Sequence, residues 1–152
     1  MNLETARKGI DYVGVGVVFA CHDGNGNFLF AKRGLAARDG HGLWEIPAGA
    51  LEMGETVEEA VVRELSEELC VEPIAMEYMG YKDVMQFAHE TVQKHWIAFE
   101  FLVLVDPAKV VIGEPDRCDG IEWRTLDNIP EALHYGTKET IERIRTFLAS
   151  KH

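Results

Sequence analysis

The sequence of 152 residues has few basic side chains and no long apolar run. Its 15 Lys and Arg residues face 26 Asp and Glu residues, which leaves a formal net charge of −11. Affinity for a nucleic-acid polymer comes mainly from basic side chains that displace counterions, so this balance argues against such a partner and against an anionic membrane. The longest apolar stretches, residues 13–21 and 97–105, are well short of the roughly 20 residues that a membrane-spanning helix requires.

Cysteine is scarce as well. Cys21, Cys70 and Cys118 are odd in number and include no C-x-x-C pair, a pattern that disfavours a disulfide framework and a zinc knuckle. Residues 1–11 are charged and lack the apolar run of a secretory signal. Free thiols are typical of a reducing compartment, so we expect a cytoplasmic protein in which Cys21 and Cys118 are buried, inert thiols.

Composition and length are those of one folded domain. With 47% hydrophobic and 27% charged residues, the chain has the composition of an ordinary globular protein. A chain of about 150 residues buries enough surface for one sizeable core. No repeat or linker is evident in the sequence. We therefore expect residues 1–152 to form a single domain, as a monomer or as a homodimer.

The order of apolar runs and turn residues predicts a mixed α/β domain, of the α+β kind, in which helices cover a sheet. Runs of β-type residues predict strands at 13–21, 28–31, 43–46, 74–87, 95–105 and 121–123. The first two flank a Gly/Asn-rich turn and are typical of a hairpin. Surface loops are expected at 34–42 and at 47–55. Helical patterns occur at 57–69, briefly within 126–133, and from Thr137 onward.

The helix expected over 57–69 carries the most informative pattern. Thr56 and Glu59 form a capping box, which places the start of the helix at Thr56. At about 100° per residue, one apolar stripe is formed by Val57, Val61, Val62, Leu65 and Leu69. Spacings of three and four residues collect three carboxylates on a neighbouring arc, those of Glu64, Glu67 and Glu68. Glu68 projects to the margin of the apolar stripe and should be partly buried.

Three carboxylates this close together repel one another, and burial increases the cost. Arg63 can neutralise one of them. Hard oxygen ligands clustered in this way also suit Mg²⁺ or Mn²⁺. Spacing alone leaves open the alternative of an acidic helix face that is simply solvated.

The residues around this helix resemble the Nudix hydrolase signature, G-x5-E-x7-R-E-U-x-E-E-x-G-U, where U is a bulky aliphatic residue. The match includes, at the required spacing, Gly49, Glu55, Arg63, Glu64, Leu65, Glu67, Glu68 and Val71. Cys70 stands where the family has glycine. Because such a glycine normally takes a positive φ, cysteine there is expected to cost on the order of 1 kcal/mol or to shift the end of the helix. A pattern of this length is highly specific.

The resemblance implies a Nudix fold, a mixed β-sheet sandwiched between helices. It also implies hydrolysis of a diphosphate linkage with the help of a divalent cation, Mg²⁺ or alternatively Mn²⁺. An acidic site needs such cations to bind an anionic diphosphate. The implied metal ligands are the Gly49 carbonyl and the side chains of Glu64, Glu67 and Glu68, all three within reach of one cation.

The resemblance assigns further roles around these ligands. Glu64 could alternatively orient or deprotonate the attacking water. Arg63 would hold the carboxylates by ion pairing, and Glu55 would brace the loop against the helix. Family members also carry a general base or an extra ligand outside the signature. The candidates for it here are Glu52, Glu114, Asp116 and Asp119.

Residues 113–123, with His95-Trp96 upstream, resemble the downstream region of small nucleoside triphosphate pyrophosphohydrolases of this superfamily. The implied substrate is a nucleoside triphosphate, oxidised or otherwise modified ones included, and the products are nucleoside monophosphate and pyrophosphate. Two alternatives stay open: a hydrolase of ADP-ribose or another nucleoside diphosphate derivative, and a Nudix-fold nucleotide-binding module without turnover. A base slot needs aromatic and hydrogen-bonding groups, for which the candidates are His41, His95 and Trp123. The expected partner is a small nucleotide.

Overall fold

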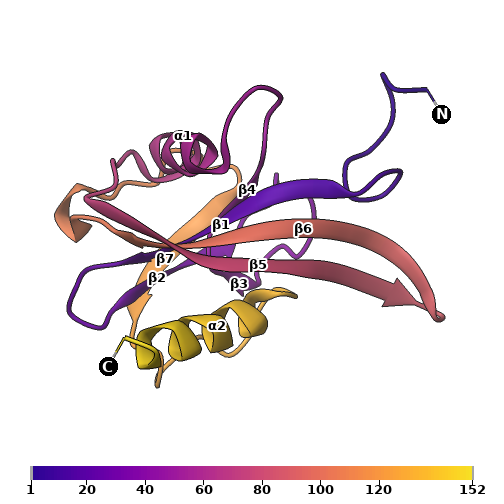
Figure 1. Cartoon of the computed structure of the whole chain (residues 1–152). Helices are drawn as coiled ribbons and strands as arrows, with labels where there is room; N and C mark the ends of the chain where they lie inside the picture. Colours follow the sequence, from indigo (N-terminus) through magenta and orange to yellow (C-terminus); the bar gives the residue numbers. More distant parts are fainter. Residues whose placement is uncertain (1, 152) are drawn as a thin grey trace.

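The computed structural model describes residues 2–151, which form a mixed β-sheet with one helix on each face (Figure 1). The strands are β1 (Gly14–His22), β2 (Phe28–Arg33), β3 (Trp44–Glu45), β4 (Ala48–Ala50), β5 (Ala75–Ala88), β6 (Thr91–Leu104) and β7 (Cys118–Arg124). The helices are α1 (Val57–Leu69) and α2 (Thr137–Ala149), and a short 3₁₀ helix, η1, spans Pro107–Lys109. The expected fold class is confirmed.

Strand β1 lies at the centre of the sheet, whose main order is β3-β2-β1-β6-β5. One edge of β1 pairs in parallel with β6, from Gly14 opposite Trp96 to His22 opposite Leu104. The other edge is shared, because β4 pairs antiparallel with residues 16–18 while β2 pairs at His22. β7 continues the sheet beyond β2. The β5–β6 hairpin is long and extends beyond the body of the molecule (Figure 1).

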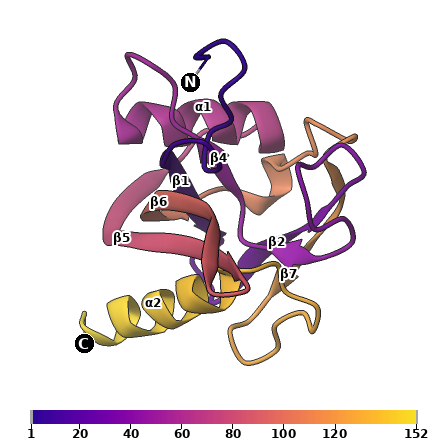
Figure 2. The same cartoon turned by 90° about the vertical axis from the view of Figure 1, so that its right-hand side faces the viewer.

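Two hydrophobic cores lie on opposite faces of the sheet. On the α1 face, the helix stripe packs against alternate strand residues, among them Val17, Phe19, Phe101 and Val103. On the α2 face, Ile141 and Ile144 pack against Val18, Ala20, Phe30 and Leu102. Figure 2 shows the two helices on either side of the sheet. Because both faces of β1 are covered, this strand reads as a nearly continuous apolar run.

Four expectations about local structure are wrong. Residues 126–133 form turns and bends instead of a helical turn. Pro130 interrupts this segment, and the backbone at the end of the segment pairs with Trp44. The expected loop 47–55 contains β4, which completes the shared edge of β1. Val62 lies at the margin of the helix stripe and is 41% exposed. Cys118 is half-buried, whereas Cys21 is fully buried as expected.

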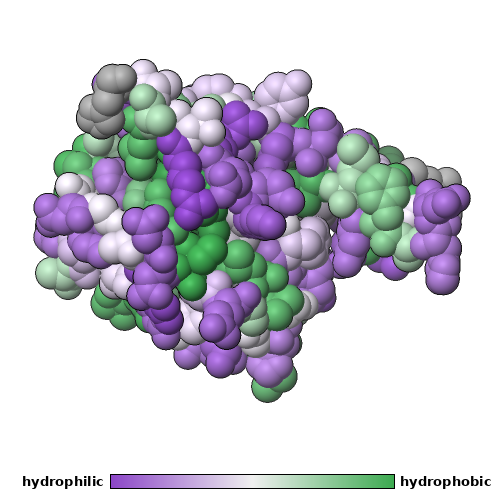
Figure 3. Space-filling model, turned by 90° about the horizontal axis from the view of Figure 1, so that it is seen from below, coloured by the Kyte–Doolittle hydropathy of each residue, from purple (hydrophilic) through white to green (hydrophobic). Residues whose placement is uncertain are grey.

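The surface shows the polar character that the composition predicts. Seen from the α2 side in Figure 3, hydrophilic side chains cover most of this face and apolar ones show between them near its centre. Within residues 2–151, no helix is both long and apolar enough to cross a membrane.

Candidate active site

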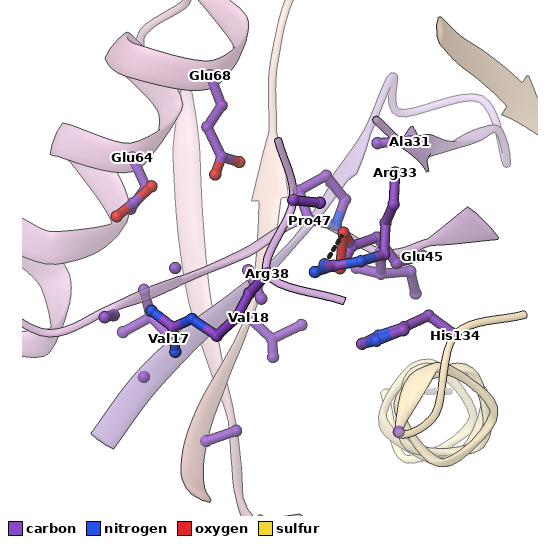
Figure 4. A pocket seen from close by; sticks show the side chains of 18 of the residues that line it. Val17, Val18, Ala31, Arg33, Arg38, Glu45, Pro47, Glu64, Glu68 and His134 are labelled. Atoms are coloured by element: carbon purple, nitrogen blue, oxygen red, sulfur yellow. Dashed lines mark hydrogen bonds and ion pairs between the residues drawn. The ribbon is translucent and has the colours of Figure 1, made fainter. Parts of the chain in front are cut away.

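A cavity of about 640 Å³ lies between α1 and the N-terminal end of α2. Its walls come from β1, β2, the segment from β3 to β4, and the middle of the β5–β6 hairpin. Figure 4 shows Glu64 and Glu68 pointing into it from α1, with Arg33, Arg38 and His134 across from them. The cavity is of the size of typical ligand sites.

Helix α1 begins with the expected capping box. The Glu59 amide donates to the Thr56 hydroxyl at 3.1 Å, and the Thr56 amide donates to the Glu59 carboxylate at 3.4 Å. The helix ends at Cys70, which has a φ of 54°. The expected positive φ is therefore confirmed, with cysteine in place of the family's glycine.

Arg63 donates hydrogen bonds to several groups of the site. Its Nε and Nη2 donate to Glu55 at 3.0 and 2.6 Å, and its Nη1 donates to Glu64 at 2.9 Å and to Glu67 at 3.2 Å. Nη2 also donates to the Ala50 carbonyl at 2.9 Å, which ties α1 to β4. The hydrogen bonds with Glu55 are the main reason why the pKa of Arg63 is raised. Arg63 therefore stays charged and holds three carboxylates around it.

Glu55 braces the loop before α1 in the way that the resemblance implies. Besides its contacts with Arg63, its carboxylate accepts the Glu52 amide at 2.8 Å. The hydrogen bonds from Arg63 lower the pKa of Glu55. The loop from β4 to α1 is thus closed on itself and on the helix.

Glu64 and Glu68 form a close acidic pair on the inner side of α1. Glu64 is 8% exposed, and burial raises its pKa although Arg63 acts in the opposite direction. Burial also raises the pKa of Glu68 well above its usual value, and the neighbouring charge of Glu64 adds to the effect. Glu68 is half-buried, as expected. Two carboxylates in this position are costly unless a cation neutralises them.

Gly49 lies directly against Glu64 of this pair. A Cβ atom at Gly49 would overlap the carboxyl group of Glu64, so only glycine lets β4 approach the helix so closely. The Gly49 carbonyl and the two carboxylates are hard oxygen donors of the type that Mg²⁺ and Mn²⁺ prefer. The donor set therefore fits a divalent cation of this kind.

The three carboxylates do not converge on one point in this structure, and their joint ligation of one cation stays a prediction. Glu67 also lines the cavity, but its side chain is 51% exposed and pairs with Arg63. Over residues 2–151, no group of three or more His, Cys, Asp or Glu side chains is arranged to hold a metal ion. Glu67 lies on the outer flank of the acidic arc, where Arg63 one turn earlier captures it.

The candidate bases other than the residues that the signature defines divide into two groups. Glu52 and Glu114 line the cavity. Glu52 lies 3.5 Å from Arg63, and Glu114 is positioned by the amide of Gly113, which donates to the Glu68 carbonyl at 2.8 Å. Asp116 and Asp119 lie outside the cavity, and Asp119 pairs with His41 at 3.3 Å.

The three candidates for substrate contact all lie outside the cavity. His41 pairs with Asp119, and His95 pairs with Asp83 at 2.9 Å on the α1 face of the hairpin. Trp123 packs against the core under α1. Trp96, the neighbour of His95, does line the cavity because successive strand residues point to opposite faces.

Sequence reasoning also missed a polar cluster on the wall opposite α1. The carboxylate of Asp39, in the loop 34–42, accepts hydrogen bonds from Lys94 at 2.5 Å, His134 at 2.8 Å and Arg33 at 3.2 Å. Arg33 in turn pairs with Glu45 at 2.7 Å (Figure 4). Burial raises the pKa of Asp39, but the hydrogen bonds from Lys94 and His134 outweigh it and lower the pKa overall. The partners are far apart in the sequence, so no local motif marks them.

A family model described as NUDIX domain matches residues 12–144. The chain belongs to the NUDIX family. It is 33% identical over 93 residues to the NAD-capped RNA hydrolase NudC of Pseudomonas aeruginosa, which covers 59% of this chain and 29% of that protein. It is 42% identical over 59 residues to the RNA pyrophosphohydrolase of Acinetobacter baylyi, with coverage of 39% and 31%. This chain matches under a third of the length of these two curated relatives.

Solved structures share the NUDIX fold over most of the chain. A MutT NUDIX hydrolase from Burkholderia pseudomallei superposes with a TM-score of 0.76 and 29% identity, covering 88% of this chain and 98% of that one. The NUDIX domain of Shewanella oneidensis NrtR, in complex with ADP ribose, superposes with a TM-score of 0.71. It is 18% identical, with coverage of 97% and 94%, and therefore supports the fold alone.

Proposed function

We propose that this NUDIX domain is a metal-dependent hydrolase that converts a nucleoside triphosphate to a nucleoside monophosphate and pyrophosphate. The observation that carries the proposal is the acidic pair of Glu64 and Glu68. Glu64 is buried, lies against Gly49 and is held by Arg63, and Glu68 is half-buried beside it. Structural stability alone disfavours two like charges there. A site for a divalent cation gives them a reason to be present.

The residues that would hold the cation are Gly49, through its carbonyl, with Glu64 and Glu68, and with Glu67 once its side chain turns inward. Mg²⁺ is the first candidate and Mn²⁺ the second, because both prefer hard oxygen donors. When bound, such a cation offsets the charge of the phosphate chain and lowers the pKa of a bound water.

The protein's own residues supply orientation and a proton acceptor. In the reaction, the oxygen of a water forms a bond to phosphorus, and the bridging oxygen leaves with pyrophosphate. The proton of the water passes to a carboxylate, for which Glu52, Glu64 and Glu114 are the candidates that line the cavity. Arg63 keeps Glu64 and Glu67 in place through ion pairs of 2.9 and 3.2 Å. Positioning of this kind is a large part of catalysis in phosphoryl transfer.

A nucleoside diphosphate derivative, such as ADP-ribose, is the second candidate substrate. Support comes from the relative named as an NAD-capped RNA hydrolase. The cavity of about 640 Å³ is large enough for a nucleotide with a further group. Both substrates present a diphosphate to the same acidic pair, so the mechanism is shared.

The test measures product formation from nucleoside triphosphates, deoxynucleoside triphosphates and ADP-ribose, with Mg²⁺ and with EDTA. We expect pyrophosphate release with Mg²⁺, no release with EDTA, and a fall in kcat of at least about 100-fold in Glu67→Gln, in line with the loss of one strong charge-stabilising group. Glu58→Gln, an exposed change of the same kind on α1, should keep full activity. Turnover that survives both EDTA and Glu67→Gln contradicts the proposal, as does nucleotide binding without any product. Faster turnover of ADP-ribose selects the second substrate.

A further inference from the structure

One part of the cavity wall is formed by Trp96 of β6. A Cβ atom at Gly9 or at Gly14 would overlap the indole ring, so these two glycines form a cradle that seats it. The ring is fixed from that side by backbone, which no side-chain rearrangement can remove. The rest of the half-buried ring faces the cavity. The indole therefore presents a flat, rigid, apolar surface to a ligand in the cavity.

The guanidinium of Arg38 lies over this indole, with its Cζ 5.3 Å from the ring centre. Arg38 belongs to the loop 34–42 and is exposed. In the part of the chain that the structure describes, its guanidinium takes part in no hydrogen bond or ion pair with protein groups. Its neighbour Asp39 anchors the loop through Lys94, His134 and Arg33. The loop is thus fixed while the Arg38 side chain itself is free to move.

We propose that Arg38 and Trp96 form the binding site for a planar nucleobase, which inserts between the guanidinium and the indole. The inference deepens the proposed function and rests on it for the identity of the substrate as a nucleotide. The acidic pair on α1 and the Arg38–Trp96 pair line the same cavity. A diphosphate at the first therefore directs the attached nucleoside toward the second.

The geometry favours a flat group over an anion beside Trp96. A stacked base needs about 7 Å between the planes on its two sides, twice the optimal carbon separation of about 3.5 Å. Arg38 therefore moves outward by about 2 Å on binding, which a long exposed side chain does readily. An isolated phosphate would use the charge of Arg38 and gain nothing from the indole. A base uses both, because its faces stack on an aromatic ring and on a guanidinium alike.

The experiment uses Trp96 as its own reporter. In the double variant Trp44→Phe/Trp123→Phe, Trp96 is the remaining tryptophan of three. The fluorescence of this variant is titrated in EDTA with AMP and with ribose 5-phosphate, which has the same phosphate and sugar but no base. We expect AMP to quench Trp96 and ribose 5-phosphate to leave it unchanged. Dissociation constants come from calorimetry in EDTA, where that for AMP should be about 5- to 100-fold lower than that for ribose 5-phosphate.

Two further variants separate stacking from charge. Arg38→Met should weaken AMP binding several-fold and leave ribose 5-phosphate unchanged, whereas the exposed control Lys109→Met should change neither. Trp96→Leu should bring the two dissociation constants together, and Trp96→Phe, which keeps a ring in the glycine cradle, should keep most of the difference. Equal quenching by both probes, or an equal loss of both in Arg38→Met, overturns the proposal in favour of an anion site. The experiment measures binding and no turnover. Its result therefore tests the base site even if the hydrolase proposal fails.

Discussion

At the scale of single residues, Cys70 shows how the backbone can keep a conformation that its side chain disfavours. Its φ of 54° and ψ of 34° are left-handed, and its amide donates to the Leu65 carbonyl. The amides of Val111 and Gly113 donate to the carbonyls of Leu69 and Glu68, so the following loop closes the end of the helix. These hydrogen bonds fix the backbone geometry at residue 70 whatever its side chain. The folded state therefore carries the steric cost of a cysteine in the left-handed conformation.

Replacing Cys70 by glycine should therefore stabilise the protein. The steric relief of about 1–2 kcal/mol exceeds the added entropy of the unfolded chain, which leaves a gain of roughly 0.5–1 kcal/mol in the free energy of unfolding. Urea denaturation measures the difference. Ser66→Gly, an exposed change inside α1, is the control and should cost about 1 kcal/mol. A Cys70→Gly variant less stable than the wild type would contradict the account of this position.

The acidic pair makes a second prediction at this scale. The folded state raises the pKa of Glu68 through burial and the charge of Glu64, so ionisation of Glu68 destabilises the fold. The penalty appears as pH rises above the unfolded pKa of about 4.3 and is absent below it. In EDTA at pH 7, Glu68→Gln should therefore raise the free energy of unfolding by roughly 1–2 kcal/mol.

The control for Glu68→Gln is again Glu58→Gln, which is exposed and should change stability by less than about 0.5 kcal/mol. Both variants are compared with the wild type by urea denaturation at pH 4 and pH 7. The advantage of Glu68→Gln should be small at pH 4 and disappear when Mg²⁺ is added at pH 7. A variant that is less stable than the wild type in EDTA would show that the pair is stabilising by itself.

At the scale of elements, one carboxylate of the loop 34–42 ties it to three other segments. Asp39 receives hydrogen bonds from β2, β6 and the segment before α2, through Arg33, Lys94 and His134. The loop forms a wall of the cavity. Its position therefore depends on β2 beside it and on two segments far away in the sequence.

Asp39→Asn should loosen this wall and lower the free energy of unfolding by roughly 1 kcal/mol at pH 7, a value reduced for partial exposure. The folded state lowers the pKa of Asp39, so its contribution is present above the unfolded pKa of about 3.9 and is lost as pH falls through the folded pKa. Denaturation at pH 7 and pH 3 checks this, with the exposed Asp127→Asn as control. An equal difference at both pH values would argue against an ionised Asp39.

The same scale explains what the sequence could reveal about the site. Helix α1 was predictable because its capping box, apolar stripe and acidic arc are all local patterns of one helix. The pairing of Asp39 with His134 joins residues 95 positions apart, and no local pattern marks such a contact. On β6, His95 and Trp96 are neighbours, and of the two only Trp96 lines the cavity. In a strand, a shift of one residue moves a side chain to the opposite face of the sheet.

At the scale of the whole molecule, the α+β class follows from the order of strand-like and helix-like segments, and the structure confirms it. The order and pairing of the strands did not follow from the sequence. The parallel pairing of β1 with β6 joins residues about 80 positions apart, and the short β4 exists only because β1 offers it an edge. That edge places Gly49 against Glu64, so the site depends on a feature of the assembled sheet.

The central claim is that the acidic pair on α1, with the Gly49 carbonyl, binds a divalent cation. Calorimetric titration of the metal-free protein with Mn²⁺ tests it most directly, because no substrate or turnover is needed. We predict saturable binding by the wild type and by Glu58→Gln, and a loss of at least about tenfold in affinity for Glu64→Gln and Glu68→Gln, as expected when a charged ligand is removed. Equal Mn²⁺ affinity in all four proteins, or no binding by the wild type, would contradict the account.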